Sequence, residues 1–479
     1  MQKKQLIIIL LLIPLLLTGQ EKALKLLLAD SSMKSSSVSL CILNAVNGEA
    51  VFEFHAEESL MPASVLKLVT SSAAMELLGP DYRFETKIGY TGNFNKRTGR
   101  LNGDIVIKGG GDPALGSEYF KDHYSNFLKN WIIEIRKLGI KKIAGRVLVD
   151  DSWYDYQPVP AKWLWEDAGN YYGAGAYGLS VFDNKFEIHF RTRGEGSTPE
   201  ITGIVPDQCK SELSNQLIAS GDTDEGYVFS SPYNKYRWIA GSIPVNTEDF
   251  VLKASITDPP MLLAEVFDSM LDSVGIDISE SPSTVRIGNK PVINAMVVIS
   301  EISSPALRDI IEVLNHESVN LYAEHLLKEL GRTFNNQGTS KAGVEVLYRF
   351  LKDSGVNSTG LFLEDGSGLS PLNAVTSRSL VEILLFMKNK AKYFSEFYSS
   401  LPYAGKEGTL RYYFRDPVFD SNLRAKSGSI TRVRSFAGYF RTLSGKEMVF
   451  CILINNYSGP SKRIITGIED ILMETISNK

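Results

Sequence analysis

Ser64-Val65-Leu66-Lys67 is the stretch that decides the fold of this chain, together with Ser318-Val319-Asn320 and Lys426-Ser427-Gly428 further along. A serine and a lysine three positions apart lie on one face of a helix, about one turn apart. A serine hydroxyl is a weak nucleophile and needs an adjacent base. A lysine amine becomes such a base when burial and positive neighbours lower its pKa. Apolar residues around Lys67 favour that burial, so the first string predicts a lysine-activated serine at the start of a helix over residues 64–78.

The other two strings supply the remaining parts of an acyl-transfer site. Ser318 and Asn320 stand at the start of a second predicted helix, where Ser318 would relay a proton and Asn320 would hold a substrate amide. Lys426, Ser427 and Gly428 lie in a strand pattern, and a glycine within a strand often marks a close backbone approach. We expect Lys426 and Ser427 to bind a terminal carboxylate. The backbone N–H groups of Ser64 and Ser429 would form an oxyanion hole.

Each string has a simpler explanation when it stands alone. An exposed serine and lysine on a helix, a helix N-cap serine and a turn account for the three strings one at a time. Similar strings occur by chance at Ser31-Ser32-Met33-Lys34 and Arg97-Thr98-Gly99. The combination is specific because the order and the predicted local structure of all three strings agree.

Strand patterns occur at both ends of the chain. Alternating apolar residues at 37–43 and 51–54 flank Asn47-Gly48, a strong hairpin signal. Near the other end, strand patterns at 435–439 and 448–455 precede an amphipathic helix from about residue 461. We therefore expect one antiparallel sheet built from both termini, with helices packed on its faces.

The middle of the chain differs from its ends. Between residues 78 and 292, strand-like runs alternate with glycine, proline and asparagine, and aromatic residues cluster from Trp153 to Tyr172. That cluster is more typical of a hydrophobic core than of a sugar-binding platform. We expect a β-rich insertion over 86–292, formed by two nested domains, which divides a catalytic domain made of 21–85 and 293–479.

The N-terminus reads as a targeting segment. Lys3 and Lys4 precede an apolar run of 12 residues from 6 to 17. A bilayer-spanning helix needs about 20 residues. The pattern predicts a secretory signal peptide over 1–20, with an uncleaved anchor as the alternative. The protein would then be secreted across the inner membrane to the periplasm or cell envelope.

Composition narrows the function classes. A net charge of −4 excludes a basic surface for nucleic acid. Five histidines in no H-E-x-x-H or Cys/His pattern predict neither a metal site nor a cofactor. A Ser-His-Asp triad stays open, although no G-x-S-x-G elbow is present. Three cysteines argue against a disulfide scaffold and leave open whether Cys41 and Cys451 pair.

The chain resembles the D-alanyl-D-alanine carboxypeptidase/endopeptidase family of low-molecular-mass class C penicillin-binding proteins, peptidase family S13. Five further stretches extend the resemblance over most of the chain: Gly110-Gly111-Asp112-Pro113-Ala114-Leu115, Val149-Asp150-Asp151-Ser152, Asp183-Asn184, Asp365-Gly366-Ser367-Gly368-Leu369-Ser370 and Leu401-Pro402-Tyr403-Ala404-Gly405-Lys406-Glu407-Gly408-Thr409-Leu410.

The resemblance implies an α+β fold with a penicillin-binding/β-lactamase-type transpeptidase domain. It implies Ser64 as the acylated nucleophile, Lys67 as its base, and two further motifs: Ser318 with Asn320, and Lys426, Ser427 and Gly428. The substrates would be peptidoglycan stem peptides ending in D-Ala-D-Ala and D-Ala-linked cross-bridges. Penicillins and other β-lactams would acylate Ser64 as inhibitors. The oligomeric state and the balance of carboxypeptidase and endopeptidase action are not fixed by the sequence.

Three positions depart from the family pattern. Val319 replaces a common aspartate, Ser427 replaces a common threonine, and Pro371 replaces an arginine that many relatives carry. The last change puts in question how the third residue of the stem peptide is held. Two other functions remain open: a β-lactamase-like hydrolase, which needs a base for deacylation that the sequence does not reveal, and a wall-binding or penicillin-sensing module with a silent site.

Overall fold

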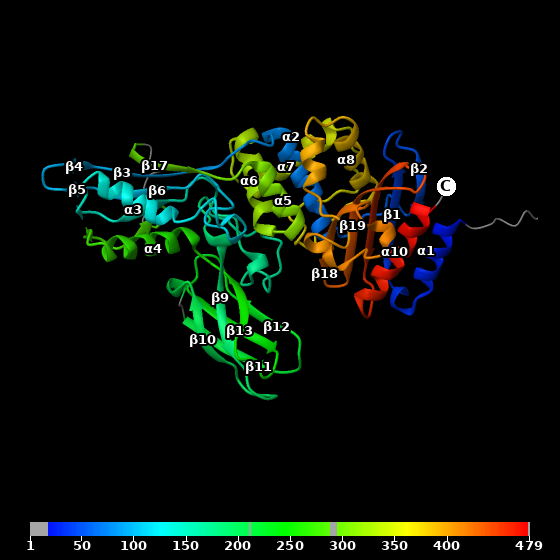
Figure 1. Ribbon diagram of the computed structural model, residues 1–479, viewed down its shortest axis with the longest axis horizontal. Helices are drawn as coiled ribbons and strands as arrows, with labels where there is room; N and C mark the ends of the chain where they lie inside the picture. The colour runs from blue at the N-terminus through cyan, green and yellow to red at the C-terminus, as the bar shows by residue number, and fades with distance from the viewer. Residues whose placement is uncertain (1–17, 210–211, 288–294, 478–479) are drawn as a thin grey trace, which may run out of the picture.

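The computed structural model describes residues 18–209, 212–287 and 295–477 (Figure 1). A five-stranded antiparallel sheet joins the two ends of the chain, in the order β18-β19-β20-β1-β2. Its strands are β18 (Arg424–Ile430), β19 (Val433–Arg441), β20 (Glu447–Asn455), β1 (Ser37–Asn44) and β2 (Ala50–Phe54). The predicted hairpin and the predicted sheet from both termini are confirmed, as is the α+β penicillin-binding/β-lactamase-type fold.

Helices cover both faces of this sheet. Helix α8 (Ser377–Asn389) packs on β1 and β20, while α10 (Ser461–Ser477) contacts β19 on the opposite face and carries α1 (Gly19–Ala29) beside it. Successive side chains of β1 alternate between two cores: Cys41 and Leu43 belong to one, Leu40 and Ile42 to the other. Because both faces are buried, β20 is almost uniformly apolar rather than alternating.

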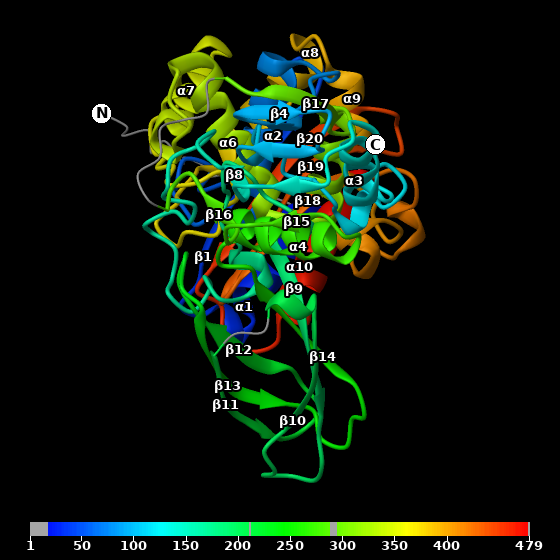
Figure 2. The same cartoon turned by 90° about the vertical axis from the view of Figure 1, so that its left-hand side faces the viewer.

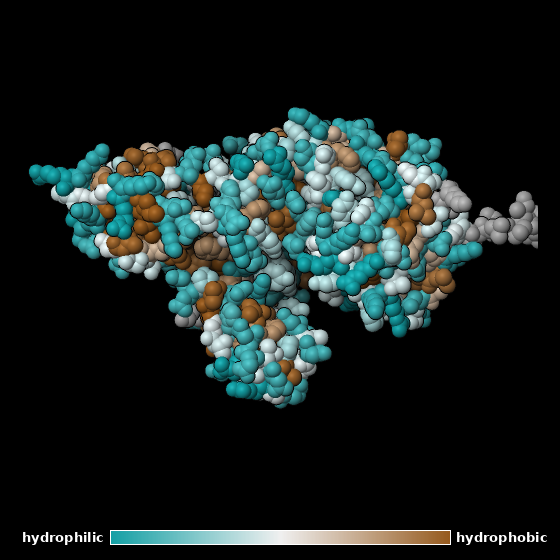
Figure 3. Space-filling view, viewed as in Figure 1, coloured by the Kyte–Doolittle hydropathy of each residue, from teal (hydrophilic) through white to brown (hydrophobic). Residues whose placement is uncertain are grey.

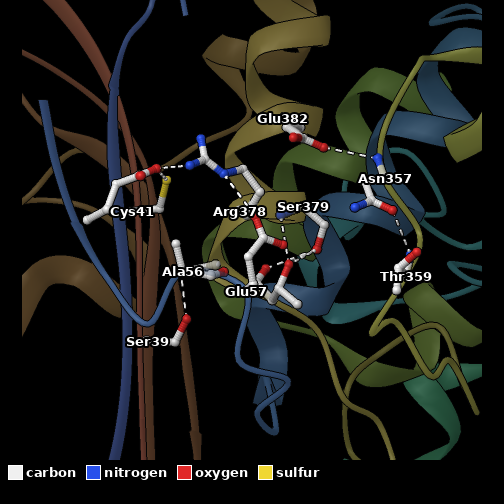
Figure 4. Close-up of polar contacts among 12 residues, drawn as sticks. Ser39, Cys41, Ala56, Glu57, Asn357, Thr359, Arg378, Ser379 and Glu382 are labelled. Carbon is white, nitrogen blue, oxygen red and sulfur yellow. Dashed lines mark hydrogen bonds and ion pairs between the residues drawn. The ribbon is translucent and has the colours of Figure 1, made fainter. Parts of the chain in front are cut away.

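Polar contacts fix α8 to the first hairpin (Figure 4). Arg378 on α8 pairs with Glu53 on β2 and lies 3.4 Å from Glu57. The Ser39 hydroxyl on β1 donates to Ser377 at 2.8 Å, and both groups are buried. These contacts hold the helix and the N-terminal strands in one register.

A second group of helices lies beside the sheet. Helix α2 (Lys67–Leu78) is buried over most of its length and contacts α5 (Leu307–Glu317), α6 (Asn320–Asn335), α7 (Ser340–Asp353) and α8. The short α9 (Phe394–Ser399) closes the far end of this group. Two of the three strings therefore start helices, α2 and α6, that pack directly against each other.

The middle of the chain forms four smaller sheets. One has the order β16-β8-β6-β3-β17 and another the order β15-β7-β5-β4, with α3 (Phe127–Lys137) and α4 (Pro259–Ser273) packed beside them. Their strands are β3 (Glu85–Tyr90), β4 (Asn93–Asn95), β5 (Arg100–Asn102), β6 (Ile105–Lys108), β7 (Lys142–Ile143), β8 (Val147–Asp150), β15 (Asp277–Ile278), β16 (Ser283–Thr284) and β17 (Val297–Ser303).

The other two sheets form a lobe that projects from the body in both views (Figures 1 and 2). Their orders are β10-β9-β14 and β11-β13-β12. The strands are β9 (Lys185–Arg191), β10 (Glu200–Val205), β11 (Glu212–Ala219), β12 (Glu225–Phe229), β13 (Tyr236–Ile243) and β14 (Phe250–Ser255). The division of the chain into domains at residues 86 and 292 stays a prediction, and β17 pairs with β3 across that division.

The cysteines and the N-terminus complete the comparison with the sequence. Cys41 and Cys451 are register partners in β1 and β20, yet both are free thiols, as is Cys209.

The apolar run 6–17 lies outside the described residues, and the signal peptide over 1–20 stays a prediction. No helix in the described part of the chain is long and apolar enough to cross a membrane.

Candidate active site

The first string places a buried amine against the serine hydroxyl. Residues Ala63–Leu66 form a 3-10 turn, and the α-helix begins at Lys67 rather than at Ser64. A tighter 3-10 turn at a helix N-terminus is common. The Lys67 amine lies 2.9 Å from Ser64 Oγ. No histidine of the described residues contacts that hydroxyl, so the geometry favours lysine over a Ser-His-Asp triad.

The surroundings of Lys67 make its amine a candidate base. Its side chain is fully buried, and it also donates to Asn320 Oδ1 at 2.6 Å and to the Ser367 carbonyl at 2.8 Å. Burial lowers the pKa of Lys67 to about 7, although the carboxyl groups of Asp365 and Glu324 act in the opposite direction. An amine with a pKa near neutrality is free to accept a proton at ordinary pH.

The rate of acylation is therefore expected to depend on pH through Lys67. Only the neutral amine accepts the Ser64 proton, so the rate should rise about tenfold per pH unit below about pH 7 and level off above it. Stopped-flow measurement of penicillin acylation across this range tests the expectation. A rate that falls as pH rises through 7 would contradict Lys67 as the base.

The second string lies between helices α5 and α6 and contacts the first string through Asn320. Ser318 has a left-handed backbone (φ 59°) in the link between α5 and α6, and Val319 occupies the N-cap position of α6 without a side-chain cap. The N-cap explanation for Ser318 is thus wrong, because its hydroxyl instead accepts a hydrogen bond from Lys426 Nζ at 2.9 Å. Asn320 accepts from Lys67 and donates to the Tyr172 carbonyl at 2.9 Å.

The third string lies on the edge strand β18. Lys426 is fully buried and donates to Ser318 Oγ and to the Ser427 carbonyl at 2.8 Å. Burial and the nearby Lys67 hold the pKa of Lys426 well below its ordinary value. A carboxylate bound beside it would favour the charged form again. Ser427 Oγ donates to Thr409 Oγ1 at 2.8 Å, so the hydroxyl is already oriented in the free protein.

Gly428 allows β18 to approach the nucleophile. A Cβ at this position would lie 2.8 Å from the Pro62 carbonyl and 2.9 Å from the Ser64 backbone nitrogen, besides meeting Ser435 Oγ. Backbone atoms cannot move aside as a flexible side chain can. The close approach that the sequence predicts for this glycine is therefore present, and it sets the spacing between β18 and Ser64.

Replacing Gly428 by alanine is expected to slow acylation roughly a hundredfold, because a displacement of about 1 Å in a reacting site has an effect of that size. Gly203, in strand β10, is a matched control because a Cβ there has no neighbour closer than 3.8 Å. Acylation rates of the Gly428→Ala and Gly203→Ala proteins provide the test. Equal rates in the two variants would show that the strand spacing does not matter.

Two buried carboxyl groups that the strings did not reveal support the site. Glu324 is fully buried one turn after Asn320 on α6 and accepts from the backbone N–H groups of Gly366 (3.1 Å) and Ser367 (2.9 Å). Burial raises the pKa of Glu324. Asp365 accepts from Trp163 Nε1 at 2.8 Å and from two backbone amides of its own loop. Together they hold the carbonyl of Ser367 against Lys67. The sequence feature that could have indicated Glu324 is its position four residues after Asn320, which places both side chains on one face of a helix.

The first two strings meet at a cleft of about 640 Å³. The third string reaches it only through the following residue, Ser429, while Lys426, Ser427 and Gly428 lie behind its lining. Ser64, Ser318, Asn320 and Ser429 line one part of it, and Pro371 lies at its wall. The opposite part comes from the middle of the chain: Tyr119, Leu164, Glu166, Asp167, Tyr171, Tyr172, Asp183, Lys185 and Tyr227. Figure 3 shows the notch between the projecting lobe and the part that carries the five-stranded sheet.

The prediction that the aromatic cluster from Trp153 to Tyr172 is hydrophobic core was only partly right. Tyr154 and Trp163 are buried, at 3% and 8% exposed, but Trp165 and Tyr171 are 56% and 51% exposed. The difference arises because Tyr171 lines the cleft, whereas Trp165 packs outside it on Phe229 and Trp238, so part of each ring faces solvent. Composition alone does not distinguish a ring that lines a cleft from one inside a core.

The fold and this geometry together define a penicillin-binding serine acyl-transferase. The sequence model of the D-Ala-D-Ala carboxypeptidase 3 (S13) family matches residues 20–474. The chain belongs to that family of serine-type D-Ala-D-Ala carboxypeptidases. A family that acts on the cell wall implies a location outside the cytoplasm.

Individual relatives are similar to this chain over nearly its whole length. The D-alanyl-D-alanine carboxypeptidase of Actinomadura sp. (strain R39) is 27% identical over 93% of this chain and 82% of its own length. The carboxypeptidase DacB of Haemophilus influenzae is 24% identical over 89% and 86%. The crystal structure of penicillin binding protein 4 (dacB) from H. influenzae has a TM-score of 0.80 at 21% identity, covering 93% of this chain and 97% of that one. The same protein has been crystallised in complex with a β-lactam.

Proposed function

We propose that this protein hydrolyses the terminal D-Ala-D-Ala bond of peptidoglycan stem peptides through an acyl-enzyme on Ser64, and that it also cleaves D-Ala-linked cross-bridges. One observation carries the proposal. A fully buried lysine amine, with its pKa lowered to about 7, lies 2.9 Å from the Ser64 hydroxyl. A serine so paired has the base that it needs to attack a peptide carbonyl.

In the first step, Ser64 Oγ attacks the carbonyl carbon of the penultimate D-Ala while its proton passes to Lys67. The negative charge that develops on the carbonyl oxygen is stabilised by the backbone N–H groups of Ser64 and Ser429. The proton then reaches the departing amine through the Ser318 hydroxyl, which Lys426 holds. The C–N bond breaks, terminal D-Ala leaves, and an ester to Ser64 remains.

The second step returns the enzyme to its first state. Water attacks the ester carbon, Lys67 accepts a proton from that water, and Ser64 Oγ leaves as it regains the proton. In the first step, before D-Ala leaves, Asn320 orients the substrate amide, while Lys426 and Ser427 bind the terminal carboxylate. β-Lactams enter the same first step but deacylate slowly, which makes them covalent inhibitors. No metal or cofactor is required by these steps.

The proposed endopeptidase activity rests on the cleft. Its walls come from both halves of the chain, so a substrate that extends beyond the residues at Ser64 would contact the second wall. Such a substrate lies in the cell wall, so we propose secretion across the inner membrane to the periplasm or cell envelope.

Mass spectrometry of the products from a D-Ala-D-Ala stem peptide and from a cross-linked muropeptide dimer tests both activities. We expect free D-Ala from the first substrate and two monomers from the second. Release of D-Ala alone would restrict the proposal to carboxypeptidase action. Failure to cleave either substrate would overturn it.

A further inference from the structure

A row of aromatic rings begins at the cleft, at Tyr227, and extends beyond it over the projecting lobe. Phe229 and Trp238 are register partners in β12 and β13, and their rings stack at 4.4 Å. Trp165 covers this pair, at 5.0 Å from Phe229 and 5.3 Å from Trp238, and is itself 56% exposed. Tyr227, two residues before Phe229 on the same strand face, is 40% exposed. We call these four residues the aromatic row.

This exposure is not the remainder of a hydrophobic core. Val228 and Ile239, which alternate with the row along the two strands, are fully buried inside the lobe. The sheet therefore has a complete inner face. The row lies on the outer face of β12 and β13, which pair antiparallel, and polar residues are usual on the solvent face of such a pair. Aromatic side chains gathered at a solvent-facing surface mark a ligand-binding or interaction site.

An open hollow lies along the row. Its volume is about 380 Å³, and its lining consists of Glu225, Tyr227, Phe229, Ala240 and Gly241. Ala240 is the register partner of Tyr227. Because Ala240 and Gly241 are small, they leave the space beside the two rings unfilled. Glu225 places a carboxylate, which accepts hydrogen bonds, at the margin of the hollow.

The hollow adjoins the catalytic cleft at Tyr227. Tyr227 lines both, and Leu164, the neighbour of Trp165, lines the cleft. The segment that carries Trp165 is fixed to the catalytic site, since Trp163 Nε1 donates to Asp365 at 2.8 Å and the Lys162 carbonyl accepts from Ser370 Oγ at 3.0 Å. A ligand that extends out of the cleft past Tyr227 therefore meets the row.

We infer that the aromatic row and its hollow form a subsite for the sugar that carries the stem peptide, which rests on the proposed function. A stem peptide is joined by its N-terminal end to a sugar ring of the glycan strand, so a sugar lies just beyond the peptide that fills the cleft. A pyranose ring has apolar C–H faces and a rim of hydroxyl groups. Flat rings fit the faces, and exposed carboxylates such as Glu225 and Glu166 fit the hydroxyl groups.

The surface favours a sugar over two other ligands. An extended peptide gains its affinity by pairing its backbone with a sheet edge, whereas the row lies on a sheet face. An anionic membrane surface is attracted by clustered lysine and arginine, whereas the described residues that line the hollow include Glu225 and no cation. A peptide ligand is one outcome of the test below.

The test compares two substrates that differ only in the sugar. One is a free stem peptide ending in D-Ala-D-Ala, and the other is the same peptide attached to its disaccharide. We expect Trp165→Ala to raise KM for the disaccharide-peptide roughly threefold to tenfold, the effect of one aromatic contact, with kcat/KM for the free peptide unchanged. Trp165→Tyr should restore most of the loss. Phe334→Ala, which removes another exposed ring (42%) on α6, is the matched control.

A binding measurement gives an independent readout. Titration with a β-1,4-linked N-acetylglucosamine tetramer should change the tryptophan fluorescence of the unmodified protein and of the Phe334→Ala protein. The Trp165→Ala protein, in which Trp238 is the remaining tryptophan of the row, should need a roughly threefold to tenfold higher sugar concentration for half of its change. Equal losses on both substrates, or a fluorescence response to the sugar-free peptide alone, would overturn the sugar subsite. If the unmodified protein cleaves neither substrate, the proposed function fails instead.

Discussion

Replacing Ser64 by alanine is expected to abolish covalent labelling by penicillin and to reduce D-Ala release roughly a millionfold, the scale seen when a serine nucleophile is removed. No other hydroxyl of the described residues lies against the Lys67 amine. Ser64 itself is only partly buried, and its hydroxyl contacts no group besides Lys67 in the described part of the chain. The substitution should therefore leave the fold intact.

Labelling with a fluorescent penicillin followed by denaturing electrophoresis measures the first effect. Thermal unfolding of the same protein distinguishes loss of the nucleophile from loss of structure. Labelling of a folded Ser64→Ala protein at a rate near that of the unmodified enzyme would exclude Ser64 as the acylated residue.

Replacing Lys67 should slow acylation roughly a hundredfold to ten-thousandfold, the usual contribution of a general base. Lys67→Met is the better variant, because methionine fills most of the buried volume without leaving a charged group or a large cavity. Both variants leave Asn320 Oδ1 and the Ser367 carbonyl without their donor, and Lys67→Ala adds a cavity to this effect.

Two features of the Lys67 result separate a base from a merely structural lysine. The pH dependence near 7 should disappear in Lys67→Met, and added small amines should recover part of the rate in Lys67→Ala, where the missing side chain leaves space for them. A variant that keeps the pH profile of the unmodified enzyme would point to a different base.

The parts of the fold that depend on local pattern could be predicted from the sequence. The hairpin of β1 and β2 follows from the Asn-Gly turn between apolar runs, and the start of α10 at Ser461 follows from its helical periodicity. The order of the three strings predicted that they lie together, and the contacts of Lys67 with Asn320 and of Lys426 with Ser318 agree with it. The catalytic roles of these residues stay a prediction.

The parts that depend on distant contacts could not be predicted. Glu324 supports the Ser367 carbonyl only because a loop more than 40 residues later folds back onto α6. Tyr172 joins the site through its backbone carbonyl, which no side-chain pattern reveals. The left-handed backbone of Ser318 was likewise invisible, because serine has no strong preference for that conformation.

The middle of the chain is the part whose role was least predictable from the sequence. Its strand patterns predicted a β-rich segment, but nothing local indicated that residues from Tyr119 to Tyr227 form one wall of the catalytic cleft. Pro371, one of the three departures from the family pattern, lines that cleft, and how the third stem-peptide residue is held stays a prediction to be tested.

The most direct test of the account is mass spectrometry of the penicillin-treated protein after proteolysis. The peptide that contains Ser64 should carry one penicilloyl group, with Ser64 as the modified residue, and the peptides that contain Ser318 and Ser427 should be unmodified. An adduct on any other residue, or no adduct on a folded protein, would contradict the proposal that Ser64 and Lys67 perform acyl transfer.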